Sequence, residues 1–69
     1  MMTTQELKKK LRRMRITQKD IAQAIGYNRS TVNGFLNSSE DLAPARMREI
    51  CVAAHIIAIS RVNELVMGL

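Results

Sequence analysis

The stretch QKDIAQAIGYNRSTVNGFLN, residues 18–37, decides the fold. Each half carries apolar residues at the three- and four-residue spacing typical of helices: Ile21, Ala22 and Ile25, then Val32, Phe35 and Leu36. Gly26 lies between the halves and can adopt the positive φ that a tight corner between helices requires. Thr17, with Asp20 three residues later, and Asn28 are suited to cap helix N-termini. The sequence therefore predicts two short helices joined by a tight turn.

The outward face of the second predicted helix is unusual. Opposite its apolar arc it carries Arg29, Ser30, Asn33, Gly34 and Asn37. Solvated helix faces favour better helix formers than these. Arginine can donate two hydrogen bonds to guanine, asparagine can pair with adenine, serine can bond either way, and glycine permits close approach. The face therefore favours contact with DNA bases, and a poorly optimised solvated surface is the alternative interpretation.

Several positions of this stretch resemble the helix-turn-helix of the phage repressor and Cro family, which is lambda-repressor-like and XRE-type. The positions are Gln18, Ile21, Ala22, Ile25, Gly26, Val32 and Phe35, supported by Thr-Gln at residues 17–18 and Ser-Thr-Val at residues 30–32. The likeness covers the 20-residue motif closely and residues 3–54 more loosely. It implies an all-α, four- to five-helix domain that reads an operator as a dimer, with an apolar C-terminal helix for dimerisation.

The resemblance also implies roles for individual residues. Residues 29–36 would lie in the major groove of DNA. The predicted base contacts are Arg29, Ser30 and Asn33. The predicted phosphate contacts are Gln18, Lys19, Asn28, Thr31 and Asn37, and in the family the glutamine that matches Gln18 also braces the recognition helix. Gly34 stands where a longer reading side chain is often found, which puts a third base contact in question.

Charge is distributed unevenly along the 69 residues, which suffice for one domain, residues 1–69. Up to Leu36 there are eight basic and two acidic residues, and from Asn37 onward there are three basic and four acidic residues. Basic charge concentrated on the motif favours a polyanionic partner over general solubility. A basic helix at a membrane surface would need a bulkier apolar face than the first predicted helix offers.

Helices are also expected on both sides of the motif. A capping box of Thr3 and Glu6 predicts a helix with a core stripe of Leu7, Leu11 and Met14. Its basic residues would face solvent or phosphate; they are Lys8, Lys9, Lys10, Arg12, Arg13 and Arg15. After a polar loop, Pro44 fits the first turn of a helix that closes the domain through Met47, Ile50, Cys51 and Ala54.

The segment 55–69 is apolar around most of its circumference and is the predicted dimerisation segment. The predicted interface residues are Ile56, Ile57, Ile59, Val62, Leu65 and Val66. A chain this short has no other element to cover them, so a second copy packed about a two-fold axis is expected. Residues 44–67 fit one helix, two helices that break near Ile57, or a helix interrupted by a short strand at residues 56–60.

Other classes of function lack their signals. The sequence has no phosphate-binding glycine loop, no paired carboxylates or Ser–His–Asp set suited to catalysis, and only two aromatic residues. Cys51 and His55 are two ligands and do not make a zinc site. We therefore expect no enzymatic activity, metal, cofactor or small-molecule substrate.

The expected protein is a cytoplasmic regulator of transcription that binds double-stranded DNA as a homodimer and acts as a repressor at a palindromic operator. No signal peptide is visible, and the apolar run at residues 50–59 is too short to cross a bilayer. Two alternatives remain open. One is an antitoxin-like or anti-CRISPR-associated operon regulator with a protein partner, and the other is a helical adaptor with no DNA role.

Overall fold

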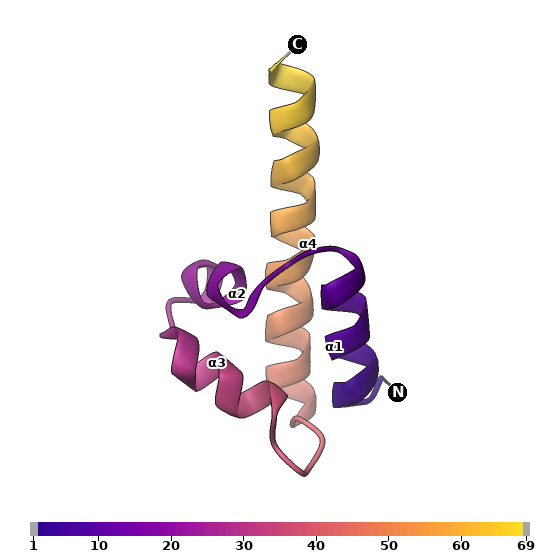
Figure 1. Ribbon diagram of the computed structural model, residues 1–69, viewed down its shortest axis with the longest axis vertical. Helices are drawn as coiled ribbons and strands as arrows, with labels where there is room; N and C mark the ends of the chain where they lie inside the picture. Colours follow the sequence, from indigo (N-terminus) through magenta and orange to yellow (C-terminus); the bar gives the residue numbers. More distant parts are fainter. Residues whose placement is uncertain (1, 69) are drawn as a thin grey trace.

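The computed structural model describes residues 2–68, which form four helices and no strand (Figure 1). The helices are α1 (Thr4–Arg13), α2 (Gln18–Ile25), α3 (Arg29–Leu36) and α4 (Pro44–Met67). α1 and α2 pack on the N-terminal half of α4, α3 packs on α2 and α1, and the C-terminal half of α4 extends beyond them. The all-α fold class is confirmed. Met1 and Leu69, the two ends of the predicted domain, lie outside the described residues.

The short helices begin where the capping signals predicted. Thr3 with Glu6, and Thr17 with Asp20, form complete capping boxes in which each side chain accepts a hydrogen bond from the backbone N–H of the other residue. Gly26 ends α2 in the left-handed region, at φ 78°. This conformation costs glycine little, and it lets the chain turn at once into α3.

One core joins all four helices. Ile21 of α2, Val32 of α3 and Ile50 of α4 are its largest fully buried side chains. The other buried hydrophobic residues are Leu7, Leu11, Ile16, Ala22, Leu36, Met47, Ala53 and Ala54. The apolar stripes predicted for α2, α3 and the first half of α4 therefore meet in one place, with Ile25, Phe35 and Cys51 partly buried at its edge.

The prediction that Met14 belongs to the core is wrong. Met14 caps the C-terminus of α1 in helical conformation, with its backbone N–H bonded to the Lys10 carbonyl, but the chain turns at Arg15, which has a positive φ of 57°, and Ile16 is buried instead. Met14 is 43% exposed.

The loop between α3 and α4 is tied to the first turn of α1. The backbone N–H of Thr4 donates to Asp41 Oδ1 at 3.1 Å, and Thr4 Oγ1 accepts from the backbone N–H of Leu42 at 2.9 Å. These bonds satisfy the buried Thr4 hydroxyl and hold the loop against the domain.

Residues 44–67 form one continuous helix, so the alternatives of a break near Ile57 and of a strand at residues 56–60 are wrong. Its first half is buried through Met47, Ile50, Ala53 and Ala54. Ile57, one of the predicted interface residues, packs partly against this core, whereas the others are exposed. By length and composition α4 could also cross a membrane, but this is a weak indication for a helix that takes part in a folded domain.

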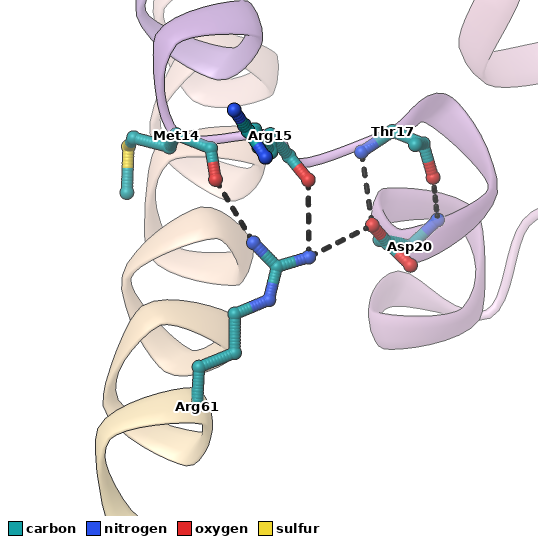
Figure 2. Close-up of polar contacts among 5 residues, drawn as sticks. All are labelled: Met14, Arg15, Thr17, Asp20 and Arg61. Carbon is teal, nitrogen blue, oxygen red and sulfur yellow. Dashed lines mark hydrogen bonds and ion pairs between the residues drawn. The ribbon is translucent and has the colours of Figure 1, made fainter. Parts of the chain in front are cut away.

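Arg61 holds the distal half of α4 to the corner between α1 and α2 (Figure 2). Its Nη1 donates to the carbonyl oxygen of Met14 at 2.9 Å, and its Nη2 donates to the carbonyl oxygen of Arg15 at 3.1 Å. Nη2 also contacts Asp20 Oδ2 at 3.2 Å. The guanidinium thus satisfies carbonyls that the end of α1 leaves without helical partners.

The Asp20 carboxylate lies at the same corner, and its pKa is below the usual value. The main cause is the hydrogen bond from the backbone N–H of Thr17, and the charge of Arg61 adds to it. Because the pKa is lowered by folding, this carboxylate stabilises the fold above the pKa of an unfolded aspartate. The contribution is lost as the pH falls through the lowered value.

We predict that Arg61→Met lowers the free energy of unfolding by about 1–2 kcal/mol, because two carbonyls and a carboxylate lose a charged donor at a partly exposed site. Urea unfolding followed by circular dichroism measures the change. Arg48→Met is the matched control, since Arg48 is exposed on the same helix. Equal effects of the two substitutions would show that the Arg61 contacts contribute nothing specific.

Candidate nucleic-acid interface

The exposed face of α3 is a direct consequence of what its other face buries. Val32 and Leu36 enter the core, which turns Arg29, Ser30 and Asn33 to the surface. These three residues line a shallow groove together with Gln18, the first residue of α2. The structure thus brings the three predicted base-contact residues together with one of the predicted phosphate contacts.

Asn28 is the N-cap of α3, and its Oδ1 atom makes all of its capping hydrogen bonds. Its Oδ1 accepts from the backbone N–H of Thr31 at 2.8 Å, from Thr31 Oγ1 at 2.8 Å and from Ser30 Oγ at 3.1 Å. The capping role predicted for Asn28 is confirmed. Both hydroxyls point their protons at the cap, which leaves their lone pairs and the Asn28 Nδ2 protons for a ligand.

A chain of polar contacts runs from α3 to α1. Asn37 Nδ2 donates to Asn33 Oδ1 at 2.7 Å and to the Asn33 carbonyl oxygen at 3.0 Å. Asn37 Oδ1 accepts from Lys8 Nζ at 3.0 Å. Asn37 therefore caps the end of α3, and it fixes the Asn33 amide with the Nδ2 group of Asn33 free to donate. A phosphate can only accept hydrogen bonds, so Asn37 would have to give up an Nδ2 bond to Asn33 in order to bind one, while its bond to Lys8 could remain.

A basic groove adjoins the α3 face at Gln18. Its lining includes Lys8, Arg12 and Arg15 beside Thr17 and Gln18. These cations surround the N-terminus of α2, where free backbone N–H groups and the positive end of the helix dipole also favour an anion. The sequence could not choose among the six cations of the first helix. Lys8, Arg12 and Arg15 line this groove, whereas Lys9, Lys10 and Arg13 do not. Lys19 is exposed on the first turn of α2.

Tyr27 packs at the turn between α2 and α3. Its ring meets Phe35 edge-on, with the ring centroids 5.8 Å apart. The guanidinium of Arg46 lies 5.0 Å from the Tyr27 centroid and 4.5 Å from the Phe35 centroid, and it pairs with Glu49 at 2.7 Å. Arg46 thus joins α4 to the end of α3 by cation–π contact. No periodic signal in the sequence marked this residue.

Two short helices joined by a glycine corner, with the second presenting a polar face beside a basic groove, define a helix-turn-helix DNA-binding domain. Residues 6–56 match the family model described as the Cro/C1-type helix-turn-helix DNA-binding domain. The match covers most of the chain, and the protein belongs to this family. No curated protein and no solved structure gives a significant match.

Gly34 lies on the exposed face of α3, and a Cβ built there meets no atom within 4 Å. We predict that Gly34→Ala raises the free energy of unfolding by about 0.5–1 kcal/mol, because alanine is the better helix former. The same methyl group should weaken DNA binding if the helix approaches bases closely. Thermal unfolding and fluorescence anisotropy with duplex DNA measure the two effects.

The control is Gly26→Ala, which should lower stability because residue 26 has φ 78°. If Gly34→Ala left DNA affinity unchanged or raised it, close approach of this part of α3 to DNA would be ruled out.

Proposed function

We propose that the protein is a transcriptional repressor of the phage Cro and repressor type, which binds a palindromic operator as a homodimer in the cytoplasm. The observation that carries the proposal is the exposed α3 face of Arg29, Ser30 and Asn33, continued by a basic groove through Gln18. Repression follows from occupying promoter DNA and requires no chemistry, metal or cofactor.

Arg29, Ser30 and Asn33 make the base contacts in this proposal. The Arg29 guanidinium makes no hydrogen bond or ion pair within residues 2–68, so it is available to donate two bonds to a guanine edge. The Asn33 Nδ2 group offers donors to an acceptor in the major groove, because Asn37 holds the Oδ1 atom. Ser30 offers a hydroxyl at the first turn of α3, nearest the groove that contains Gln18.

The phosphate contacts are assigned to the residues that surround this face. Gln18 and Lys19 at the start of α2, with Asn28 and Thr31 at the start of α3, would fix the helix on the DNA backbone. Asn37 would act together with Lys8, whose ammonium group it holds. Lys8, Arg12 and Arg15 supply the charge that makes binding depend on salt.

A homodimer would place two α3 helices at half-sites about 34 Å apart, one turn of DNA. Its support is the exposed apolar surface of α4, which includes Ile56, Ile59, Val62, Leu65 and Val66. Such a surface on a small protein marks an interaction site. The same surface favours a second candidate, an antitoxin-like operon regulator in which a different protein covers α4; co-purification from the native cell separates the two.

We predict that Arg29→Ala weakens binding to the preferred operator by about 1–3 kcal/mol and relaxes selection at one base pair, because a bidentate base contact is lost. Selection of duplexes from a random pool, followed by anisotropy titration, measures both effects. Lys19→Ala is the comparison. It should weaken all sequences alike and lower the salt slope by about one unit. Unchanged operator affinity of Arg29→Ala would refute the assigned orientation of α3.

We predict that Val62→Glu gives a folded monomer with lower operator affinity, because it brings two carboxylates into an apolar interface. Sedimentation velocity and anisotropy report mass and binding. Ser60→Glu serves as the control, since Ser60 is exposed on a side of α4 roughly a quarter turn from the apolar face. A Val62→Glu chain of unchanged mass would leave α4 without a role in dimerisation.

A further inference from the structure

On the exposed face of α4, between residues 52 and 66, the order of apolar and polar residues is nearly the same from either end. At about 100° per residue, seven residues between positions 52 and 66 fall within about 120° of one another, opposite the core-facing Met47, Ile50 and Ala54. Ala45 and Arg48 continue the same arc toward the start of α4. The seven are Val52, His55, Ile56, Ile59, Val62, Asn63 and Val66, all exposed. Their spacing of 3, 1, 3, 3, 1, 3 about Ile59 follows from the helical period itself, so the information lies in which residue types occupy these positions.

The polarity of this face has the same symmetry. Reversal about Ile59 places Val52 against Val66 and Ile56 against Val62, apolar against apolar. It places the one imidazole, His55, against the one amide, Asn63. An isologous contact requires such self-complementarity, because each residue meets the position related to it by the two-fold axis.

We infer that two copies pair antiparallel along this face, with the two-fold axis at Ile59 and His55 of each copy hydrogen-bonded to Asn63 of the other. This inference rests on the proposed homodimer and specifies its register. A parallel pairing would oppose Asn63 to Asn63 and His55 to His55. An antiparallel pairing that opposed Asn63 to Val52, Ile56 or Ile59 would leave a buried amide without a polar partner, which costs free energy.

The position of the DNA-reading helix supports the antiparallel arrangement. α2 and α3 lie on one flank of α4 and α1 on the other (Figure 1). A two-fold axis perpendicular to α4 keeps the same flank of both copies on one side, so both α3 helices can meet one duplex. A two-fold axis parallel to α4 would place the two α3 helices on opposite sides of the dimer.

The spacing along α4 is also suitable. Phe35 of α3 lies at the level of Arg46, which stacks on its ring. Arg46 is 13 residues from Ile59, or about 20 Å at 1.5 Å per residue, so the antiparallel pair separates the two Arg46 levels by about 39 Å. This is of the order of the 34 Å between successive half-sites.

A largely apolar groove between α2 and α4 would receive the end of the second helix. It is lined by Ala24, Ile25, Val52, Ala53 and Ile56, among others. Met67, at 84% the most exposed large hydrophobic residue, lies on the flank of α4 that borders this groove. In the antiparallel register Met67 reaches the level of residue 51 of the second copy, next to the groove. The distal half of α4 keeps its direction through the contacts of Arg61 with the α1–α2 corner (Figure 2).

Charge exchange tests the register. In the antiparallel pair, His55→Asp combined with Asn63→Lys brings opposite charges together. His55→Asp combined with Asn63→Asp brings like charges together. We expect the first double variant to dimerise at least about tenfold more tightly than the second, by sedimentation equilibrium without DNA. In a parallel pair both variants oppose like charges, so equal weakening would overturn the inferred register.

Disulfide trapping in a Cys51→Ala background provides the second measurement. Chains with His55→Cys and Asn63→Cys should cross-link when mixed and not when alone, whereas Ile59→Cys should cross-link with itself. Ser60→Cys is the exposed control and should form no disulfide cross-link. Self-linking of Asn63→Cys would establish parallel pairing and overturn the register while the homodimer stands. A chain that stays monomeric with Ile59→Cys unlinked, or that instead sediments with phosphatidylcholine vesicles, would refute the homodimer itself.

Discussion

The structure depends on one hydrophobic core, to which three helices each contribute a fully buried side chain. Ile21, Val32 and Ile50, from α2, α3 and α4, are the largest fully buried side chains of this core. Because the domain is so small, each of the short helices can bury only one face. The residues that a helix buries therefore determine which of its other residues are exposed. For α3, burying Val32 and Leu36 leaves a polar face that has no role in folding. The hydrophobic core is therefore what aims Arg29, Ser30 and Asn33 outward together.

The part of this arrangement that could be predicted from sequence is the part governed by local rules. The capping boxes, the left-handed corner at Gly26 and the two faces of α3 each depend on residues within a few positions of one another. The exposed polar face of α3 followed from these rules, whereas the groove that it shares with Gln18 depends on how α2 and α3 pack. The error at Met14 has a local origin too. Met14 is the last residue in helical conformation before Arg15, a non-glycine residue, adopts a positive φ, and Ile16 beyond that turn is buried in its place.

The contacts that the sequence did not predict join residues far apart in the chain, and each is made by one side chain. Arg61 reaches carbonyls 46 and 47 residues away, Lys8 reaches Asn37, and Arg46 stacks on two rings from another element. Each depends on one long side chain rather than on a repeated pattern, and a cation that binds a carbonyl looks like any solvated cation in the sequence. Such side chains are found only once the backbone has been placed.

The continuity of α4 shows why the segment forms a helix although its isoleucines favour a strand. Its isoleucines favour strands, but a strand at residues 56–60 would have had no neighbour with which to exchange backbone hydrogen bonds. A helix satisfies its own backbone groups, and no glycine or proline interrupts residues 45–67. The cost is an exposed apolar face on a protein with a small core. Any partner that covers this face, or DNA that binds the native α3, stabilises the folded chain by mass action. Folding and DNA binding are therefore linked equilibria in this protein, and the proposed pairing would be linked to both. DNA bound to the native α3 offsets the cost of the helix-weakening Gly34.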